Sequence, residues 1–278
     1  MGLLLAGPGL SGASAQAQQP AKKEQGSILP QLDACNATRG TNADARITAC
    51  TAIIDSGLAS DHGVAVAYNN RGMVRLTKQD YGRAIEDYTA AIQKDPEYAK
   101  AYNNRGAAFE KKGDYDRAIA DFGEALKLEP TYANAMANRA SAYQKTGKLK
   151  EALADLDKAI ELQPTVGALW NDRCWLRAHM ETVQAALSDC DEAIRLGPNI
   201  ATRFDSRGFV HLKAAEWQAA ISDYDKALQL DRELATSLYG RGYAKTKLGD
   251  VQAGNSDMAA ATKRRPKIAS EFAGHGLR

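Results

Sequence analysis

The hexapeptide AYNNRG occurs at residues 67–72 and again at residues 101–106, so the two copies are offset by 34 residues. The same spacing separates the prolines at positions 96, 130, 164, 198 and, after Arg232, 266. Six units follow in register without insertion or deletion, and they begin at Ala65, Ala99, Ala133, Gly167, Ala201 and Ala235. A fixed period of this length indicates an array of stacked supersecondary units.

Each unit carries the pattern of two amphipathic helices. In the first unit Ala84, Tyr88 and Ala91 recur at helical spacing, which places an apolar stripe along one helix face. Counted from the start of a unit, the eighth place is small and the 27th is alanine in all six units, so the two helices can approach closely. Glycines such as Gly113 and Gly147 fall between the helices, where they can end the first helix in a left-handed conformation.

This pattern resembles the tetratricopeptide repeat, whose order of an aromatic residue, a small residue, Ala-x3-Phe and then proline fits residues 65–266. The resemblance implies an all-α fold, in which six helix-turn-helix units stack into a right-handed superhelical solenoid. It also implies that the first helix of each unit lines the inner, concave wall. The chain departs from the family at the seventh place, where arginine replaces the usual apolar residue.

The segments outside the repeats have distinct compositions. Residues 1–17 are apolar and rich in small residues, which predicts a signal peptide, and residues 18–30 read as a polar linker. Residues 31–64 resemble a degenerate N-terminal repeat, and residues 267–278 predict a capping helix over the last apolar face. We therefore expect a periplasmic or secreted protein, with a cytoplasmic protein as the alternative if residues 1–17 are not a signal.

Arginine at the seventh place and aspartate at the 23rd form two unbroken series. The arginines are Arg71, Arg105, Arg139, Arg173, Arg207 and Arg241, and the aspartates are Asp87, Asp121, Asp155, Asp189, Asp223 and Asp257. The neighbouring eighth and 24th places pack across the helix pair in this family, so each arginine is expected near an aspartate. An acid for every base favours a structural ladder over a row of arginines that awaits an anionic ligand.

Asparagines gather at the fifth and sixth places of the first units. They are Asn69, Asn70, Asn103, Asn104 and Asn138. Some tetratricopeptide superhelices resemble this chain in carrying inner-wall asparagines whose amides can bind the backbone of an extended peptide. The alternative is plain inner-wall polarity or local hydrogen bonding. Trp175 and Phe209 share the ninth place on the expected inner wall, where they could form an apolar pocket for a partner side chain.

The four cysteines fall into two pairs with similar spacing. Cys174 and Cys190 occupy the eighth and 24th places of one unit, and Cys35 and Cys50 are 15 residues apart in the degenerate unit. Both places come into contact in the repeat, so we expect disulfides Cys35–Cys50 and Cys174–Cys190. Disulfides persist in oxidising compartments, which agrees with export. Free buried thiols are the alternative, and metal binding is disfavoured because no CxxC occurs.

Composition narrows the function. A formal net charge of +2 argues against a dedicated nucleic-acid binder, and no apolar stretch is long enough to span a membrane. No sequence signature of catalysis, phosphate binding, a cofactor or a metal is found. We therefore expect a noncatalytic scaffold that binds a protein or peptide partner in its concave groove, in the bacterial envelope, with a self-assembling structural protein as the alternative.

Overall fold

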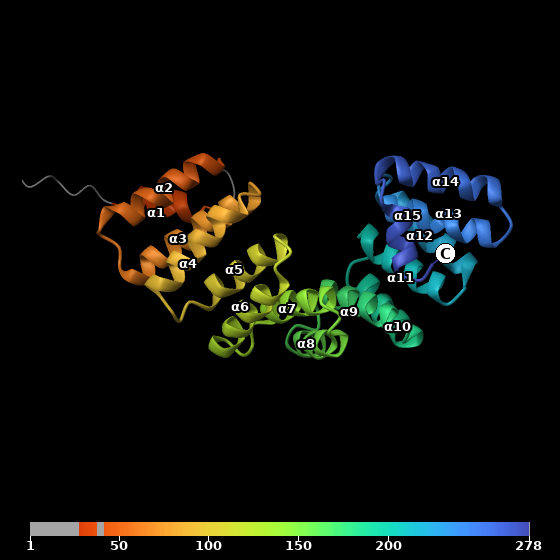
Figure 1. Cartoon of the computed structure of the whole chain (residues 1–278), viewed down its shortest axis with the longest axis horizontal. Helices are drawn as coiled ribbons and strands as arrows, with labels where there is room; N and C mark the ends of the chain where they lie inside the picture. Colours follow the sequence, from red (N-terminus) through yellow and green to blue (C-terminus); the bar gives the residue numbers. More distant parts are fainter. Residues whose placement is uncertain (1–27, 38–41, 278) are drawn as a thin grey trace, which may run out of the picture.

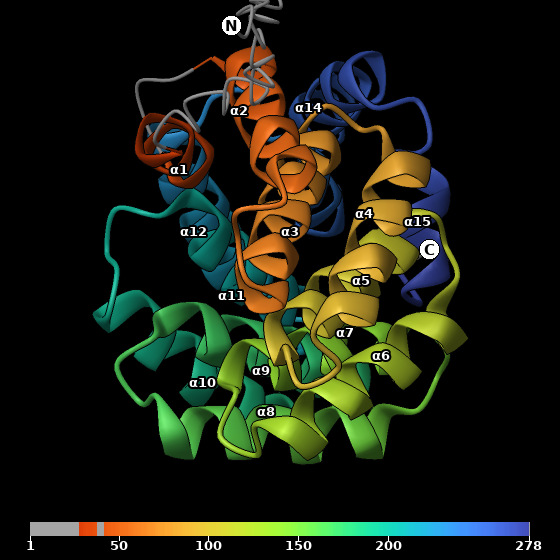
Figure 2. The same ribbon diagram turned by 90° about the vertical axis from the view of Figure 1, so that its left-hand side faces the viewer.

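The structure is a computed structural model, and it describes residues 28–37 and 42–277. Fifteen α-helices and no strand are found in these residues, in an open, curved array (Figure 1). Figure 2, turned by 90°, shows the helix pairs wound around a common axis. The helices are α1 Leu29–Asn36, α2 Ala43–Ser56, α3 Asp61–Thr77, α4 Tyr81–Lys94, α5 Ala99–Lys111, α6 Tyr115–Leu128, α7 Ala133–Lys145, α8 Leu149–Leu162, α9 Gly167–His179, α10 Val183–Arg195, α11 Ala201–Lys213, α12 Trp217–Leu230, α13 Ala235–Lys247, α14 Val251–Arg264 and α15 Ile268–Gly274.

The order of contacts explains the curvature. Each helix packs on the next one along the chain, and the first helices of neighbouring units also contact one another, α3 with α5, α5 with α7, α9 with α11 and α11 with α13. These first helices therefore form the inner wall of the solenoid, and the second helices form the outer wall. Residues 1–27, which contain the expected signal peptide and most of the linker, lie outside the described residues.

Small residues let the two helices of a unit approach each other. A Cβ added to Gly72 would lie 2.8 Å from Tyr88 Cε1, and one added to Gly106 would lie 2.8 Å from Phe122 Cε1. In the fourth unit, the disulfide Cys174–Cys190 takes the place of this glycine and aromatic ring. The alanines at the twentieth and 27th places, such as Ala118 and Ala125, are fully buried between the helices. The periodic small residues therefore form the core of the array.

The turn between the two helices of a unit needs a left-handed residue at the fifteenth place. Glycine supplies it at Gly113, Gly147 and Gly249, whereas three other units use a residue with a side chain at positive φ. Those three residues are Gln79 with φ 61°, Glu181 with φ 59° and Ala215 with φ 57°. Each of them costs about 1 kcal/mol or more relative to the right-handed region.

We expect Glu181→Gly to raise the free energy of unfolding by about 1 kcal/mol, because glycine adopts positive φ without a Cβ clash. Glu181 is exposed, so the substitution removes little packing. Denaturant unfolding measures the effect, and Gly147→Ala at the same place should lower stability by a similar amount. Equal stability of Glu181→Gly and the parent chain would contradict this account of the turn.

The C-terminal helix lies on the inner side of the last units, in addition to covering the final helix pair (Figure 1). Ile268, Phe272 and Leu277 are buried in one apolar cluster with Leu238 of α13 and Ala261 of α14. Phe272 and His275 also contact Phe209 of α11 and His179 of α9, which a cap over the last apolar face alone would not reach.

Candidate ligand groove

All six arginines of the seventh place contact the aspartate at the 23rd place of the same unit. The shortest nitrogen–oxygen distances are 2.8 Å for Arg71–Asp87, 2.7 Å for Arg105–Asp121, Arg139–Asp155 and Arg173–Asp189, 2.6 Å for Arg207–Asp223 and 2.8 Å for Arg241–Asp257. Both nitrogens of one guanidinium edge are engaged, as in Arg105, where Nε and Nη2 donate to the two oxygens of Asp121. The arginines are therefore committed to the scaffold.

Most of these arginines also reach the preceding unit. Arg105 Nη1 donates to Thr89, and Arg173 Nη1 donates to Asp157 at the equivalent 25th place. Arg207 and Arg241 repeat the contact with Asp191 and Asp225. The sequence analysis did not predict this second acceptor, the residue at the 25th place of the preceding unit. The aspartate that recurs at the 25th place in three units could have indicated it. The arginines thus join neighbouring units as well as the helices within a unit.

The asparagines of the first units hydrogen-bond one another, and we call this chain of contacts the amide network. Asn104 Nδ2 donates to Asn69 Oδ1 at 2.8 Å, and Asn138 Nδ2 donates to Asn103 Oδ1 at 2.9 Å. Asn70 donates in the same way to Asn36. Asn69 and Asn103 are buried at 3% and 6% exposure, whereas the asparagines of the sixth place are half-buried. In each of these contacts the fifth-place asparagine is therefore buried in the scaffold, and the sixth-place asparagine that donates to it stays partly accessible.

The amide network stops between the third and fourth units. The fifth place becomes Ala137 and the sixth becomes Asp172, so no amide pair can form there. One unit later the pair is Asn171 with the shorter Ser206, and Asn171 Oδ1 is buried without a hydrogen-bond partner. At the next boundary Asp205 faces Gly240, and its carboxylate accepts instead from Ser237 at 2.5 Å. Acidic and shorter side chains thus replace amides along this part of the wall.

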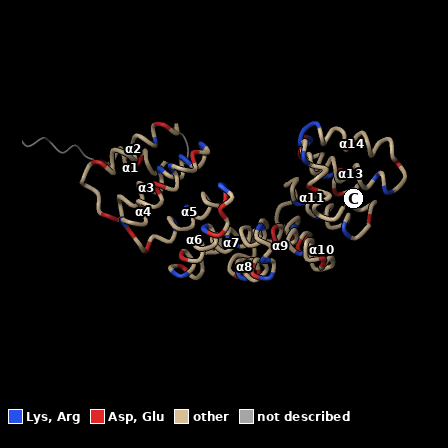
Figure 3. The backbone as a smooth tube through the Cα atoms, in the orientation of Figure 1, with Lys and Arg blue, Asp and Glu red and all other residues tan. Residues whose placement is uncertain are grey.

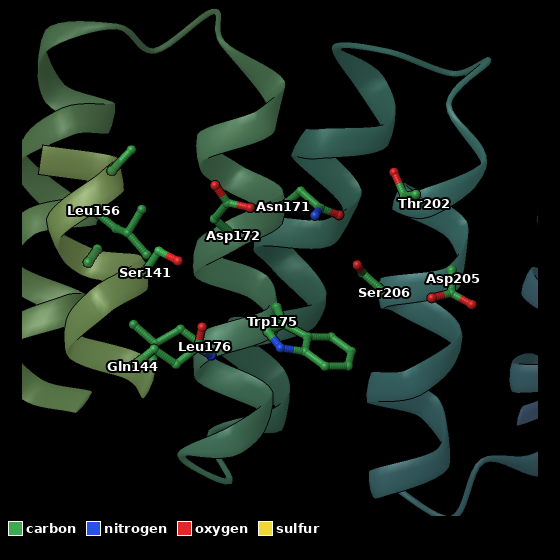
Figure 4. A pocket seen from close by; sticks show the side chains of 12 residues that line it. Ser141, Gln144, Leu156, Asn171, Asp172, Trp175, Leu176, Thr202, Asp205 and Ser206 are labelled. Carbon is green, nitrogen blue, oxygen red and sulfur yellow. The ribbon is translucent and has the colours of Figure 1, made fainter. Parts of the chain in front are cut away.

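A cavity of about 310 Å³ opens on the inner wall at this point, and we call it the inner pocket (Figure 4). Its lining comes from α7, α8, α9 and α11. The residues are Ala137, Ala140, Ser141, Gln144, Leu156, Asn171, Asp172, Trp175, Leu176, Thr202, Asp205 and Ser206. In Figure 4 the Trp175 indole extends from α9 toward α11, below Asn171 and Asp172. The inner pocket therefore combines one aromatic ring with several polar groups.

The electrostatics of the inner pocket are set by two carboxyl groups. The protein around Asp172 displaces water from its carboxyl and raises its pKa to about 6, which a hydrogen bond from Asn171 partly offsets. Burial likewise raises the pKa of Asp205 to about 6, in spite of hydrogen bonds from Ser237 and Thr236. Among the described residues neither carboxylate forms an ion pair, unlike the aspartates of the ladder. The inner pocket is therefore a site of uncompensated negative charge.

Trp175 and Phe209 do come together, with ring centroids 4.5 Å apart, but the chain itself covers them. Phe272 of α15 lies 6.4 Å from Phe209, and His275 contacts both rings at 5.6 Å. Phe209 is consequently 2% exposed. Together with Trp175 it still lines a cavity of about 580 Å³, and Phe272 and His275 at the C-terminal end form part of the wall of that cavity. Trp175 stays half-buried and lines the inner pocket. Sequence reasoning missed this cover because α15 lies outside the repeat.

A pair of histidines joins α15 to the inner wall. His179 Nε2 and His275 Nδ1 are 2.9 Å apart, and burial lowers the pKa of both imidazoles. Lys145 and Lys213 lower both pKa values further, whereas Glu271 raises that of His275. Each lowered pKa contributes stability that is present above the unfolded value of about 6.5 and is lost as the pH falls below it.

Lowering the pH from 7.5 to 5 is therefore expected to loosen α15, because two adjacent imidazolium ions repel each other. Hydrogen exchange measures this directly: the protection factors of the α15 amides, corrected for the intrinsic rate at each pH, should fall by about tenfold relative to those of α6. A His275→Gln variant is the control, since its protection factors should fall less. An equal change of protection in α15 and α6 would contradict a role for the histidine pair.

Three further features of the described residues bear on function. No helix among them has the length and apolarity needed to cross a membrane. They also contain no group of three or more histidine, cysteine, aspartate or glutamate side chains that could hold a metal ion. Acidic and basic residues are interspersed along the chain rather than separated into regions of one sign (Figure 3).

Comparisons with known proteins agree with this geometry. The family model described as Tetratricopeptide repeat matches residues 99–132 and 133–166, and the one described as TPR repeat matches residues 72–113. No curated protein matches the sequence significantly.

Several solved structures share the fold. A tetratricopeptide repeat protein from Parabacteroides merdae has a TM-score of 0.68 at 16% identity, over 85% of this chain and 93% of that chain. A chain of the APC/C hetero-tetramer Cut9–Hcn1 has a TM-score of 0.67 at 16% identity over 85% of this chain, which spans 49% of that one. YrrB, a TPR protein with an unusual peptide-binding site, has a TM-score of 0.51 at 21% identity, over 69% of this chain and 100% of its own. The family models thus place tetratricopeptide repeats within residues 72–166, and the solved structures share the solenoid fold over most of the chain.

Proposed function

We propose that the protein is a noncatalytic scaffold that binds a protein or peptide partner along the inner wall of its superhelix. This proposal rests on the inner pocket. The described residues there do not form the asparagine–asparagine hydrogen bonds that join neighbouring units in the amide network. YrrB, which shares the fold, is described as having a peptide-binding site, and this likeness supports the same class of function.

The free part of the inner wall defines where a partner would lie. The helix α15 covers α11 and α13 near Phe209 and Tyr239, so the C-terminal end of the groove is closed by the chain itself. From α3 to α7 the wall presents the asparagines of the sixth place, Asn70, Asn104 and Asn138. Their half-buried amides are the groups that we propose to contact an extended peptide backbone.

We also propose that the protein works in an oxidising compartment, as the bacterial envelope provides. The support is that both cysteine pairs are joined, Cys35–Cys50 and Cys174–Cys190, with no free cysteine among the described residues. A thiol count on protein from the native host tests this proposal. We expect no free thiols before reduction, and four free thiols would contradict it.

Self-assembly through the last unit receives less support. Ile268 and Phe272 of α15 bury themselves against that unit, so the edge that would stack on another copy is partly covered. A partner-binding scaffold is therefore the function that we propose.

Selection from a random peptide library tests the proposed function. We expect peptides that bind the parent chain and lose at least about tenfold in affinity when Met73→Trp or Thr202→Trp blocks the inner wall. Met73 and Thr202 are exposed on α3 and α11. Glu124→Trp and Lys158→Trp on α6 and α8 of the outer wall are the matched controls and should leave affinity unchanged. Selected peptides that respond to the outer-wall variants instead would contradict a groove site.

A further inference from the structure

Two carboxylates line the inner pocket, and no cation in the described structure pairs with either of them. Asp172 and Asp205 line it from α9 and α11, and Asn171 Oδ1 is buried beside them without a donor. Its lining, as the described residues form it, contains no lysine or arginine. Elsewhere in the solenoid each aspartate of the ladder has its own arginine within 2.8 Å. A pocket with two carboxyl groups and no basic side chain in its lining is suited to a donor-rich, positively charged group.

Two basic side chains lie near the inner pocket. A second cavity of about 580 Å³, beneath α15, shares Trp175 and Asp205 with the inner pocket and is lined also by Lys145 and Arg265. Arg265 pairs with Glu271 at 3.0 Å. Among the described residues Lys145 forms no ion pair with either carboxylate of the inner pocket, although it lies close enough to lower the pKa of both histidines. The two carboxylates therefore remain open to an external cation.

Trp175 adds a second kind of attraction for the same ligand class. Its indole extends across the inner pocket between α9 and α11 (Figure 4). An aromatic face attracts a cation, and a planar guanidinium can also stack on it. The chain already uses this geometry internally, because the Arg173 guanidinium carbon lies 4.9 Å from the centre of the Trp170 ring.

We propose that the inner pocket binds the basic side chain of a partner peptide, with the guanidinium of arginine as the preferred group and the ammonium of lysine as a weaker one. This assignment rests on the proposed function and names the chemistry of its ligand. The guanidinium is preferred because its five donors can serve the carboxylate of Asp172 or that of Asp205, while its plane stacks on Trp175. Acidic side chains are excluded by repulsion from the same two carboxylates.

The test is a random heptapeptide library selected in parallel against the parent chain and the double variant Asp172→Asn/Asp205→Asn. Peptides selected by the parent are expected to carry arginine, or lysine less often, at one position, and to bind the double variant at least about tenfold more weakly. The charge-matched control is Asp116→Asn/Glu151→Gln, which removes two exposed acids of α6 and α8 and should change nothing. Asp172→Asn alone serves as a second variant, because Asp172 has no ion pair among the described residues whose loss would unfold the protein.

The outcomes separate the pocket from the groove. Peptides that lose affinity with Thr202→Trp but show no basic residue, and bind the double variant as tightly as the parent, would overturn the pocket assignment and leave the groove function standing. Failure to select any peptide whose binding depends on inner-wall residues would overturn both.

Discussion

Replacing Arg105 with alanine is expected to lower the free energy of unfolding by about 3 kcal/mol or more, because it leaves the Asp121 carboxylate buried without its partner. Asp121 is 6% exposed, and two of its hydrogen bonds come from this guanidinium at 2.7 and 2.8 Å. The effect should greatly exceed that of Arg117→Ala. Arg117 pairs with Asp114 on the surface, where such contacts contribute little.

A double-mutant cycle separates the pairing from the two residues' other contacts. Asp121→Ala in the Arg105→Ala background should cost much less than Asp121→Ala alone, and Arg105→Met/Asp121→Leu should recover most of the stability. Denaturant unfolding followed by circular dichroism supplies the four free energies. Additive losses would contradict the ladder. We expect the ion pair to fix the register between the two helices more than it adds to net stability, because the desolvation of both charges offsets much of their attraction.

Removing the Cys174–Cys190 disulfide should have the second large effect, a loss of about 3 kcal/mol for a closed loop of this size. In the double variant Cys174→Ala/Cys190→Ala the loss should be larger, because alanine leaves unfilled the volume that an aromatic ring occupies in other units. Cys174→Gly/Cys190→Phe copies Gly106 and Phe122 and should regain the packing part of the loss. Unfolding of all three chains, with and without reductant, measures both parts.

That comparison separates the stabilisation that comes from the covalent bond from the stabilisation that comes from the packing of the two side chains. Reductant should destabilise the parent chain and leave the glycine–phenylalanine variant unchanged at this site. Equal stability of the parent chain in oxidising and reducing conditions would contradict a stabilising disulfide.

Contacts between equivalent places were predictable from the sequence because the repeat transfers them from unit to unit. The pairing of Arg105 with Asp121 and of Cys174 with Cys190 both follow from the contact between the eighth and 24th places. The left-handed residue at the fifteenth place was predictable where that residue is glycine, as at Gly113. It was hidden where the chain uses Glu181 or Ala215, since those residues do not favour positive φ.

The groove was less predictable, because its features depend on departures from the period. The asparagines were recognised, but their hydrogen bonds from one unit's sixth place to the preceding unit's fifth place were not. The position of α15 was missed because contacts such as His179 with His275 join residues far apart in the chain without a repeated pattern. The inner pocket arises where Ala137 and Asp172 end the amide network, and only the fold brings those residues together with Asp205.

Mapping the contact of a selected basic peptide is the most direct test of the groove and of its pocket. The peptide is prepared with lysine at its basic position and joined to the protein by a carbodiimide, which links an amine to a carboxylate at contact distance. We predict that mass spectrometry will find the lysine attached to Asp172 or Asp205. Attachment spread over exposed acids of the outer wall, such as Asp116 and Glu151, with none in the inner pocket, would contradict the account.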